Sequence, residues 1–462
     1  MSNSKSEKKE RYTADTVWSL FILLTIIYGT VLAVMQHGSD AFPTIIQGLR
    51  KIYTSPAVLT HDYFALAGIG TAFINSAMSG LLVLCAFKLA KLPVGSSQMG
   101  VLGLVMGFAL LGKNPVNMFP ILLGGYLYSL FKKEPYKSHV TMAGFATCLA
   151  PVVSQPAHIP QIVNTIGTGG AVIMGALLGL FIGFVINSMS VFIRKSHEGL
   201  NLYNVGWGAG LISIAITAAY NAMGIERFGP GSSITPGISI AAAYGSSAYF
   251  VTELNIYLII TAAFFLLMGF LAGGAQSYKL SEILYMKADD NIFYVKYGKG
   301  PTYLAMGILG LLAAGISLVF KIHLNAPIMG AILSMIGWGG FGKAVANCVP
   351  IISGVVLAGL ARYMLAPGFY GTVPVMQYLS TQAVIWSSAF WGTCLSPMAK
   401  YFGWKWAIPI GMVHFTFASY ISTFHWGQNL YNNGLAAGFV CVVMIPIIRS
   451  IDKAGKYPPR PV

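Results

Sequence analysis

The sequence has little charge. Only 9% of its 462 residues are charged and 13 are acidic, whereas 56% are hydrophobic. A soluble domain carries roughly 25% charged residues, so this composition excludes an ordinary soluble protein and predicts an all-α integral membrane protein. The first apolar run, Val17 to Met35, is long enough to cross a bilayer. We therefore expect a true membrane segment there and not a cleaved signal.

The scarcity of acids and cysteines limits the chemistry further. The acids fall near segment ends or in loops, with Asp62 and Glu253 closest to membrane depth. This argues against paired-carboxylate catalysis and against a carboxylate proton relay. The five cysteines lie in apolar segments at no metal-ligand spacing, and His414 is expected to be a packing residue. We predict that the protein is not an enzyme and holds no metal or other cofactor.

Basic residues give the chain a net charge of +15, and their placement argues against nucleic acid as a partner. They cluster in both tails and in alternate loops, which is typical of the cytoplasmic side of a membrane protein. Those expected on the opposite side are Arg50, Lys51, Lys113, Arg227, Lys321 and Arg362. The asymmetry predicts a multi-pass protein of the cell membrane with both termini in the cytoplasm.

The apolar runs indicate about fourteen membrane segments. They lie near 17–36, 63–87, 96–111, 116–131, 138–154, 168–193, 203–222, 255–275, 301–320, 326–341, 346–363, 380–398, 405–424 and 430–448. Several are at the lower limit of length for crossing a bilayer, so whether the short central ones cross or re-enter is left open. The stretch 41–53, apolar with two basic residues near its end, predicts a helix at the membrane interface.

The two halves of the chain repeat each other. Gly112-Lys113-x-x-x-Asn117-x-x-Pro120-Ile121 recurs 230 residues later as Gly342-Lys343-x-x-x-Asn347-x-x-Pro350-Ile351. Thr147-Cys148-x-x-Pro151 recurs as Thr393-Cys394-x-x-Pro397, and Asn201-Leu-Tyr203-Asn204 as Asn429-Leu-Tyr431-Asn432. About seven segments in each half is an odd number, so the repeat is expected to be inverted in the membrane. The predicted parts are a tail at 1–16, repeats at 17–224 and 255–449, a joining loop at 225–254 and a tail at 450–462.

Lys113 and Lys343 are the main candidate site residues. Each follows a glycine-rich apolar run and precedes a segment expected to be helical. A lysine beside the positive end of a helix favours an anion, and paired short segments in two halves indicate a transporter's binding site. The alternative is that both lysines extend to the membrane surfaces and anchor short helices.

Other repeated residues complete the candidate site. Asn117 and Asn347 are predicted to bind the solute together with Thr147 and Thr393, although the Thr-Cys-x-x-Pro elements also fit a plain proline kink. The asparagines around Leu-Tyr are expected to cap helices at the membrane surface, with a role at a pore mouth or gate as the alternative. The candidate hinge residues are Gly112, Gly342, Pro120, Pro350, Pro151 and Pro397.

The paired Gly-Lys-x-x-x-Asn-x-x-Pro-Ile elements and the two Leu-Tyr-Asn elements resemble a family of uncharacterised bacterial polytopic membrane proteins. The resemblance covers nearly the whole chain and implies a bacterial inner membrane. That family is a domain of unknown function, so it supplies no substrate. The segment count alone is similar to the seven-plus-seven inverted repeats of nucleobase and sulfate or bicarbonate transporters, and Leu-Tyr-Asn-x-Gly is similar to an element of urea channels. The first likeness is an analogy of architecture, and in the second the order of the motifs differs.

The sequence favours a secondary transporter of a small anionic or zwitterionic solute that works by alternating access. The alternative is a channel or facilitator for a small neutral solute such as urea. A membrane-embedded transferase for lipid-linked substrates is less favoured, because the acidic or histidine clusters that bind metal-diphosphate are lacking. The expected partners are the solute and the lipid bilayer, and a homo-oligomer is left open. The substrate, the direction of transport and the coupling ion are not indicated.

Overall fold

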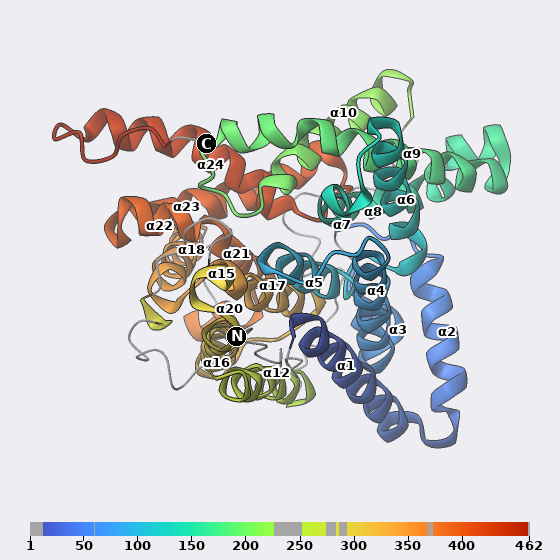
Figure 1. Cartoon of the computed structure of the whole chain (residues 1–462), viewed down its shortest axis with the longest axis horizontal. Coiled ribbons are helices and arrows are strands. Elements are labelled where there is room, and N and C mark those ends of the chain that lie inside the picture. The colour runs from blue at the N-terminus through green and yellow to red at the C-terminus, as the bar shows by residue number, and fades with distance from the viewer. Residues whose placement is uncertain are drawn as a thin grey trace, which may run out of the picture.

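The computed structural model describes residues 13–59, 61–225, 252–273, 283–285, 293–366, 368 and 373–460. Throughout these ranges the regular structure is helical, as predicted (Figure 1). Most of the predicted joining loop at 225–254 lies outside the described residues. The described part of the second half begins with a helix at Thr252, three residues before the predicted boundary.

The helices follow the predicted apolar runs. The first half contains α1 (Ala14–His37), α2 (Ala41–Tyr53), α3 (Tyr63–Ala67), α4 (Ile69–Leu89), α5 (Ser96–Phe108), α6 (Pro115–Lys132), α7 (Val140–Ala146), α8 (Ala150–Ser154), α9 (Pro160–Ser196) and α10 (Asn204–Ala222). The second contains α12 (Thr252–Leu271), α15 (Phe293–Tyr297), α16 (Lys299–Val319), α17 (Ala326–Gly337), α18 (Val345–Leu365), α20 (Val375–Thr381), α21 (Ala383–Gly392), α22 (Ser396–Phe402), α23 (Trp404–Tyr420) and α24 (Asn432–Ile451).

Nine helical stretches in the described residues are long and apolar enough to cross a membrane. The chain is therefore a multi-pass integral membrane protein. The predicted count of about fourteen also includes runs that form short or interrupted helices, among them α5, α17 and the α7–α8 and α21–α22 pairs. The helix predicted at 41–53 is present as α2 with the predicted bounds, and its place at the membrane interface stays a prediction. It buries one face through Ile45 and Ile52 while Phe42 and Lys51 stay exposed.

Equivalent helices of the two halves lie against each other, α5 against α17 near the centre of the view in Figure 1 and α10 against α24 along its upper edge. In addition, α6 packs on α9 as α18 packs on α23, and α1 packs on α4 as α12 packs on α16. The repeated sequence thus produces repeated packing.

Glycines allow α5 and α17 to touch through their backbones. Gly103 lies against Gly337, and Gly107 lies against Gly330. As the chain advances along α5, the contact moves backwards along α17, so the two equivalent helices run antiparallel. That is the arrangement produced by a two-fold axis perpendicular to the pair.

The C-terminal segment folds back onto the loop between α9 and α10. Arg449 binds Glu198 through two hydrogen bonds, Nη1 to Oε1 at 2.6 Å and Nη2 to Oε2 at 2.7 Å. The backbone N–H of Arg460 donates to the same carboxylate at 3.0 Å, and the Tyr457 hydroxyl donates to the Phe402 carbonyl at 3.1 Å. The predicted tail is therefore held against the helices as far as residue 460.

We expect Gly107→Ala to destabilise the protein, because a Cβ at this position would collide with the carbonyl oxygen of Gly330. Overpacking of this kind costs about 1–3 kcal/mol. Thermal unfolding in detergent measures the effect. Gly315→Ala in α16 is the matched control: nothing lies near its added Cβ, so it should leave stability unchanged or raise it by up to about 1 kcal/mol. Equal behaviour of the two variants would contradict the close contact of α5 and α17.

The tail contact should weaken in acid. The Arg449 guanidinium holds the pKa of Glu198 below its ordinary value, so the stabilisation is present above the unfolded-state pKa of about 4.3 and is lost as pH falls through the lower folded-state pKa. Between about pH 5 and pH 3, wild type should lose more thermal stability than Glu198→Gln, which lacks the charge. The same pH slope for both proteins would contradict this account.

Candidate functional site

The two Gly-Lys loops each join a short central helix to the helix that follows it. The chain leaves α5 at Phe108, whose carbonyl accepts the N–H groups of both Gly112 and Lys113 at 2.9 and 3.0 Å. In the second half Gly342 takes a left-handed conformation with φ of 86°, which glycine adopts without strain. Gly112 is required for a different reason, since an added Cβ would lie 2.6 Å from Leu430. Both predicted breaks are present, and hinge motion at them remains a prediction.

Asn117 and Asn347 close these loops. The Oδ1 of Asn117 accepts the N–H of Asn114 at 2.9 Å, and its Nδ2 donates to the Gly112 carbonyl at 3.0 Å. Asn347 makes the same two contacts, with Ala344 and Gly342, at 2.9 and 3.2 Å. Their side chains are thus engaged with the loop backbone, so they position the lysines. The predicted contact with a solute is not tested by this arrangement.

Both lysine side chains are completely buried, with 0% exposure. The ammonium of Lys113 donates to the Thr147 hydroxyl and to the Tyr431 hydroxyl, each at 2.9 Å. The ammonium of Lys343 donates to Thr393 at 2.8 Å and to Tyr203 at 3.1 Å. Anchors that extend to the membrane surface would be exposed at their tips, so the anchoring alternative does not fit this geometry.

Each lysine therefore takes its threonine from its own half and its tyrosine from the other half. The sequence predicted both lysines and both threonines as site residues without pairing them, and the structure places Thr147 beside Lys113 and Thr393 beside Lys343. The tyrosines were not predicted as site residues. Their repetition at an interval of 228 residues, Tyr203 and Tyr431, was the signal available in the sequence.

The asparagines before these tyrosines tie the halves together. Asn201 donates to the Gly434 carbonyl at 3.0 Å, and Asn429 donates to the Gly206 carbonyl at 3.2 Å. Both are buried, and each accepts the N–H of its own tyrosine. The expectation that asparagines cap helices at the membrane surface is wrong here: α10 and α24 begin without a side-chain cap, because the interior contact between halves satisfies these amides.

The Thr-Cys-x-x-Pro elements interrupt the α-helix of their segments with a single turn. A 3-10 turn, Thr147–Leu149, separates α7 from α8, and Thr393–Leu395 separates α21 from α22. Pro151 and Pro397 stand in the first turn of the second short helix, where proline is tolerated, and this arrangement is compatible with the predicted proline kink. By contrast, Pro120 and Pro350 lie inside α6 and α18.

Stacked aromatic rings lie beside both lysine sites. Phe108 stacks on Trp391 with centroids 4.7 Å apart, and the equivalent rings Trp338 and Phe145 stack at 5.7 Å. The ammonium of Lys113 lies 4.6 Å from the centroid of the Tyr431 ring, and that of Lys343 lies 4.7 Å from the ring of Tyr203. The two sites are thus apolar except for the ammonium and hydroxyl groups.

The charges of the two lysines are not balanced by acids. Neither ammonium has a carboxylate partner among the described residues, where every contact found for these two groups is with a neutral hydroxyl or an aromatic ring. Such neutral groups solvate an ammonium but leave its charge uncompensated. The interface between the halves therefore combines two buried basic groups with no counter-ion from the chain in its described part.

The two sites differ in what surrounds their loops. Asn75 donates to the carbonyls of Ala109 and Lys113, at 2.7 and 2.9 Å, and Asn114 caps α6 through the N–H of Asn117. The equivalent residues in the second half are Ala305 and Ala344. The Lys113 loop is thus held by polar side chains that the Lys343 loop lacks. Asn75 and Asn114 were not among the residues predicted from the sequence.

His414 and Asp62, which were also considered from the sequence, make their hydrogen bonds to groups other than the two ammonium groups. His414 is buried and pairs with Asn433 at 3.0 Å, which fits the packing role expected of it. Asp62 caps α3 and also accepts the N–H of Ala326 at the start of α17, at 3.2 Å. Burial raises the pKa of Asp62 to about 6, and its backbone hydrogen bonds partly oppose that rise.

The chain belongs to the family described as Protein of unknown function (DUF1576), whose profile matches residues 42–222 and 275–450. The two matched stretches fall on the two halves. This confirms the predicted membership in an uncharacterised family, and the family description names no activity. No curated protein and no solved structure matches the chain.

The hydroxyl of Tyr431 should stabilise the protein only through Lys113. We expect Tyr431→Phe to lower the free energy of unfolding by about 1.5–3 kcal/mol, the range for a hydrogen bond to a charged group. In a Lys113→Met background the same change should cost much less, because no buried charge remains. A double-mutant cycle by thermal or denaturant unfolding measures the coupling, and Tyr203→Phe with Lys343→Met is the matched cycle in the other half. Additive effects in both cycles would contradict the bridging role.

Proposed function

We propose that this DUF1576 protein is a secondary transporter of a small anionic or zwitterionic solute, which binds between the two halves at Lys113 and Lys343. The observation that carries the proposal is the pair of fully buried ammonium groups without carboxylate partners in the described residues. Buried basic groups in membrane segments are typical of solute pathways. At an effective dielectric of about 20, an anion about 4 Å from an ammonium contributes about 4 kcal/mol. That exceeds the value of about 2 kcal/mol for a desolvated cation–π contact.

The hydrogen-bonding capacity of the site fits such a solute. An ammonium has three donors, and the described residues accept two from each lysine. Tyr203 and Tyr431 accept these bonds, so their own O–H groups remain to be donated. A carboxylate has two oxygens that accept several hydrogen bonds. We infer that it would take the third ammonium N–H and the tyrosine O–H at one site.

Alternating access would use the same contacts. Each lysine bridges the halves through a tyrosine from the other half, so a movement of one half against the other changes both bridges. The antiparallel contact of α5 with α17 supports an inverted repeat with its axis in the membrane plane. We infer about seven segments in each half, including the short central ones, and a cell-membrane location with both termini in the cytoplasm, from the distribution of lysine and arginine.

Two alternatives give different expectations. A facilitator for a small neutral solute would use the lysines to repel cations, and its solute would bind without a charge. Within the described residues no cluster of acids or histidines favours the transferase alternative. We therefore propose transport and not catalysis.

Binding of isosteric solutes tests the proposal. Acetate and acetamide have nearly the same shape, and only acetate carries a charge. A ligand that binds the native state raises the melting temperature. Sodium acetate and the zwitterion glycine are therefore expected to raise the melting temperature of the purified protein above that in sodium chloride at equal ionic strength, and acetamide is not. Lys113→Gln should weaken this binding by roughly tenfold to a hundredfold, the loss of about 1.5–3 kcal/mol for one charge-assisted hydrogen bond.

The double variant Lys113→Gln/Lys343→Gln gives the decisive result. Glutamine can still bond the threonine and tyrosine hydroxyls, so the variant should fold, which its unfolding transition verifies. Lys132→Gln, at an exposed position, is the control for loss of a basic residue. If the double variant kept the wild-type response to acetate and glycine, or if acetamide gave the same shift as acetate, the anion site would be wrong and the neutral-solute facilitator would take its place.

A further inference from the structure

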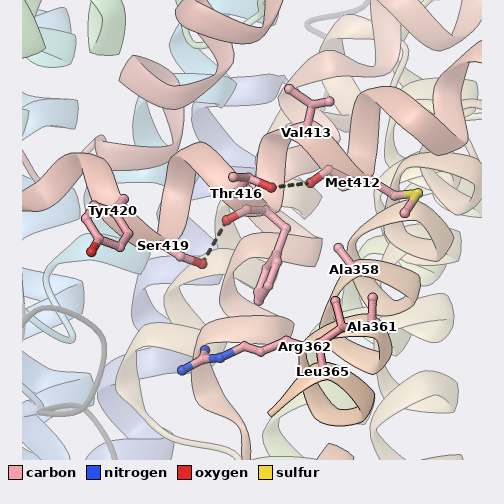
Figure 2. A pocket seen from close by; sticks show the side chains of 10 residues that line it. Ala358, Ala361, Arg362, Leu365, Met412, Val413, Thr416, Ser419 and Tyr420 are labelled. Carbon is pink, nitrogen blue, oxygen red and sulfur yellow. Dashed lines mark hydrogen bonds between the residues drawn. The ribbon is translucent and has the colours of Figure 1, made fainter.

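A groove lies between α18 and α23, away from the two lysines. It has a volume of about 500 Å³, within the range of small-molecule sites. Its walls include Ala358 and Ala361 on α18 and Met412 on α23, and Arg362 lies in the last turn of α18 (Figure 2). Figure 2 shows the Arg362 side chain extending to the side where Ser419 and Tyr420 lie. The groove is thus apolar along its length with a cation at one end.

The repeat supplies an internal comparison for this groove. The pair equivalent to α18 and α23 is α6 and α9, and both pairs cross through glycines at matching positions. Gly124 packs on the Leu180 carbonyl in the first pair, and Gly354 packs on the Ile408 carbonyl in the second. These contacts show which residues are equivalent. Equivalent residues are 230 positions apart in α6 and α18, and 228 positions apart in α9 and α23.

In the first half the corresponding space is filled by aromatic side chains of the chain itself. The residues equivalent to Ala358, Ala361 and Met412 are Tyr128, Phe131 and Phe184. The ring centroid of Phe184 lies 5.2 Å from that of Tyr128 and 5.4 Å from that of Phe131. The same fold is therefore closed by three large rings in one half and left open by two alanines and a methionine in the other.

We propose that the groove between α18 and α23 binds one acidic phospholipid, with its phosphate at Arg362 and an acyl chain along Ala358 and Ala361. Both helices belong to the stretches that are long and apolar enough to cross a membrane. At the groove's edge Leu365 and Tyr420 are 84% and 66% exposed, as expected of side chains in contact with lipid. This inference is independent of the proposed transport function.

The chemistry of Arg362 favours an anionic head group. A guanidinium binds phosphate through a fork of parallel hydrogen bonds. Arg362 also has a partner within the chain, and a guanidinium carries five N–H donors. The equivalent Lys132 lies 5.9 Å from the centroid of the Tyr128 ring, on the half whose groove is filled.

Native mass spectrometry of the full-length protein with added lipid tests the proposal. The probes are phosphatidylglycerol and phosphatidylethanolamine with identical acyl chains. Wild type is expected to retain one phosphatidylglycerol at least about tenfold more tightly than phosphatidylethanolamine, consistent with a charge-assisted contact. Ala358→Tyr/Ala361→Phe installs residues found in the first half and should abolish this retention. Arg362→Gln should keep lipid binding but lose the preference, and Lys132→Gln should change neither.

Several outcomes would overturn the proposal. They are equal retention of the two lipids by wild type, undiminished retention by the filled variant, and a wild-type dimer that dissociates when the groove is filled, which would make a second copy the occupant. Unfolding transitions show whether the filled variant folds. If the filled variant does not fold, the test rests on Arg362→Gln alone. The ratio of retained phosphatidylglycerol to retained phosphatidylethanolamine is then compared between this variant and wild type, and an unchanged ratio rejects the lipid site.

Discussion

The rest of this fold depends on two buried ammonium groups and on the polar partners that they require. A lysine in a membrane interior is unfavourable unless hydroxyls, rings or counter-charges surround it. Here each lysine obtains one hydroxyl from its own half and one from the other, so neither half can complete the surroundings of its lysine alone. The breaks at Thr147 and Thr393 are needed to bring those hydroxyls to the ammonium groups. The asparagine contacts at Gly206 and Gly434 are needed to hold the tyrosines in place.

The backbone contact of α5 with α17 also follows from the need to bring each lysine to the partners in the other half. The two lysine loops follow directly on these helices, so the loops can approach the interface only if the helices do. The glycines that permit this approach appear in the sequence as a repeated feature with no evident chemistry. In the structure they determine how far the tyrosine of one half can reach towards the lysine of the other.

Much of the architecture was predictable from the sequence because it depends on local patterns. The helices α4, α16 and α6 follow apolar runs and start at a glycine or proline, and α18 starts three residues after Gly342. The position of Lys113 and Lys343 between short segments favoured a buried site over anchoring at the membrane surfaces, and both side chains are buried. The pairing of Lys113 with Tyr431 was not predictable, because these residues are 318 positions apart and nothing in the local spacing links them. Asn201 and Asn429 were misread as surface caps for the same reason, since capping is a local rule and their carbonyl partners lie in the other half. The groove beside Arg362 was not predictable from the sequence, because it depends on how α18 packs on α23 compared with how α6 packs on α9.

Each lysine site takes its tyrosine from the other half, and this exchange suggests how the chain evolved. If the halves are inverted as proposed, a half-length protein able to insert in both orientations would contain everything required to build both lysine sites by forming an antiparallel dimer. Each copy would supply the lysine and threonine of one site and the tyrosine of the other. Fusion of two such copies would keep the shared interior while releasing each outer surface to diverge. Alanines could then replace aromatic residues on one side only, and asparagines could surround one loop only.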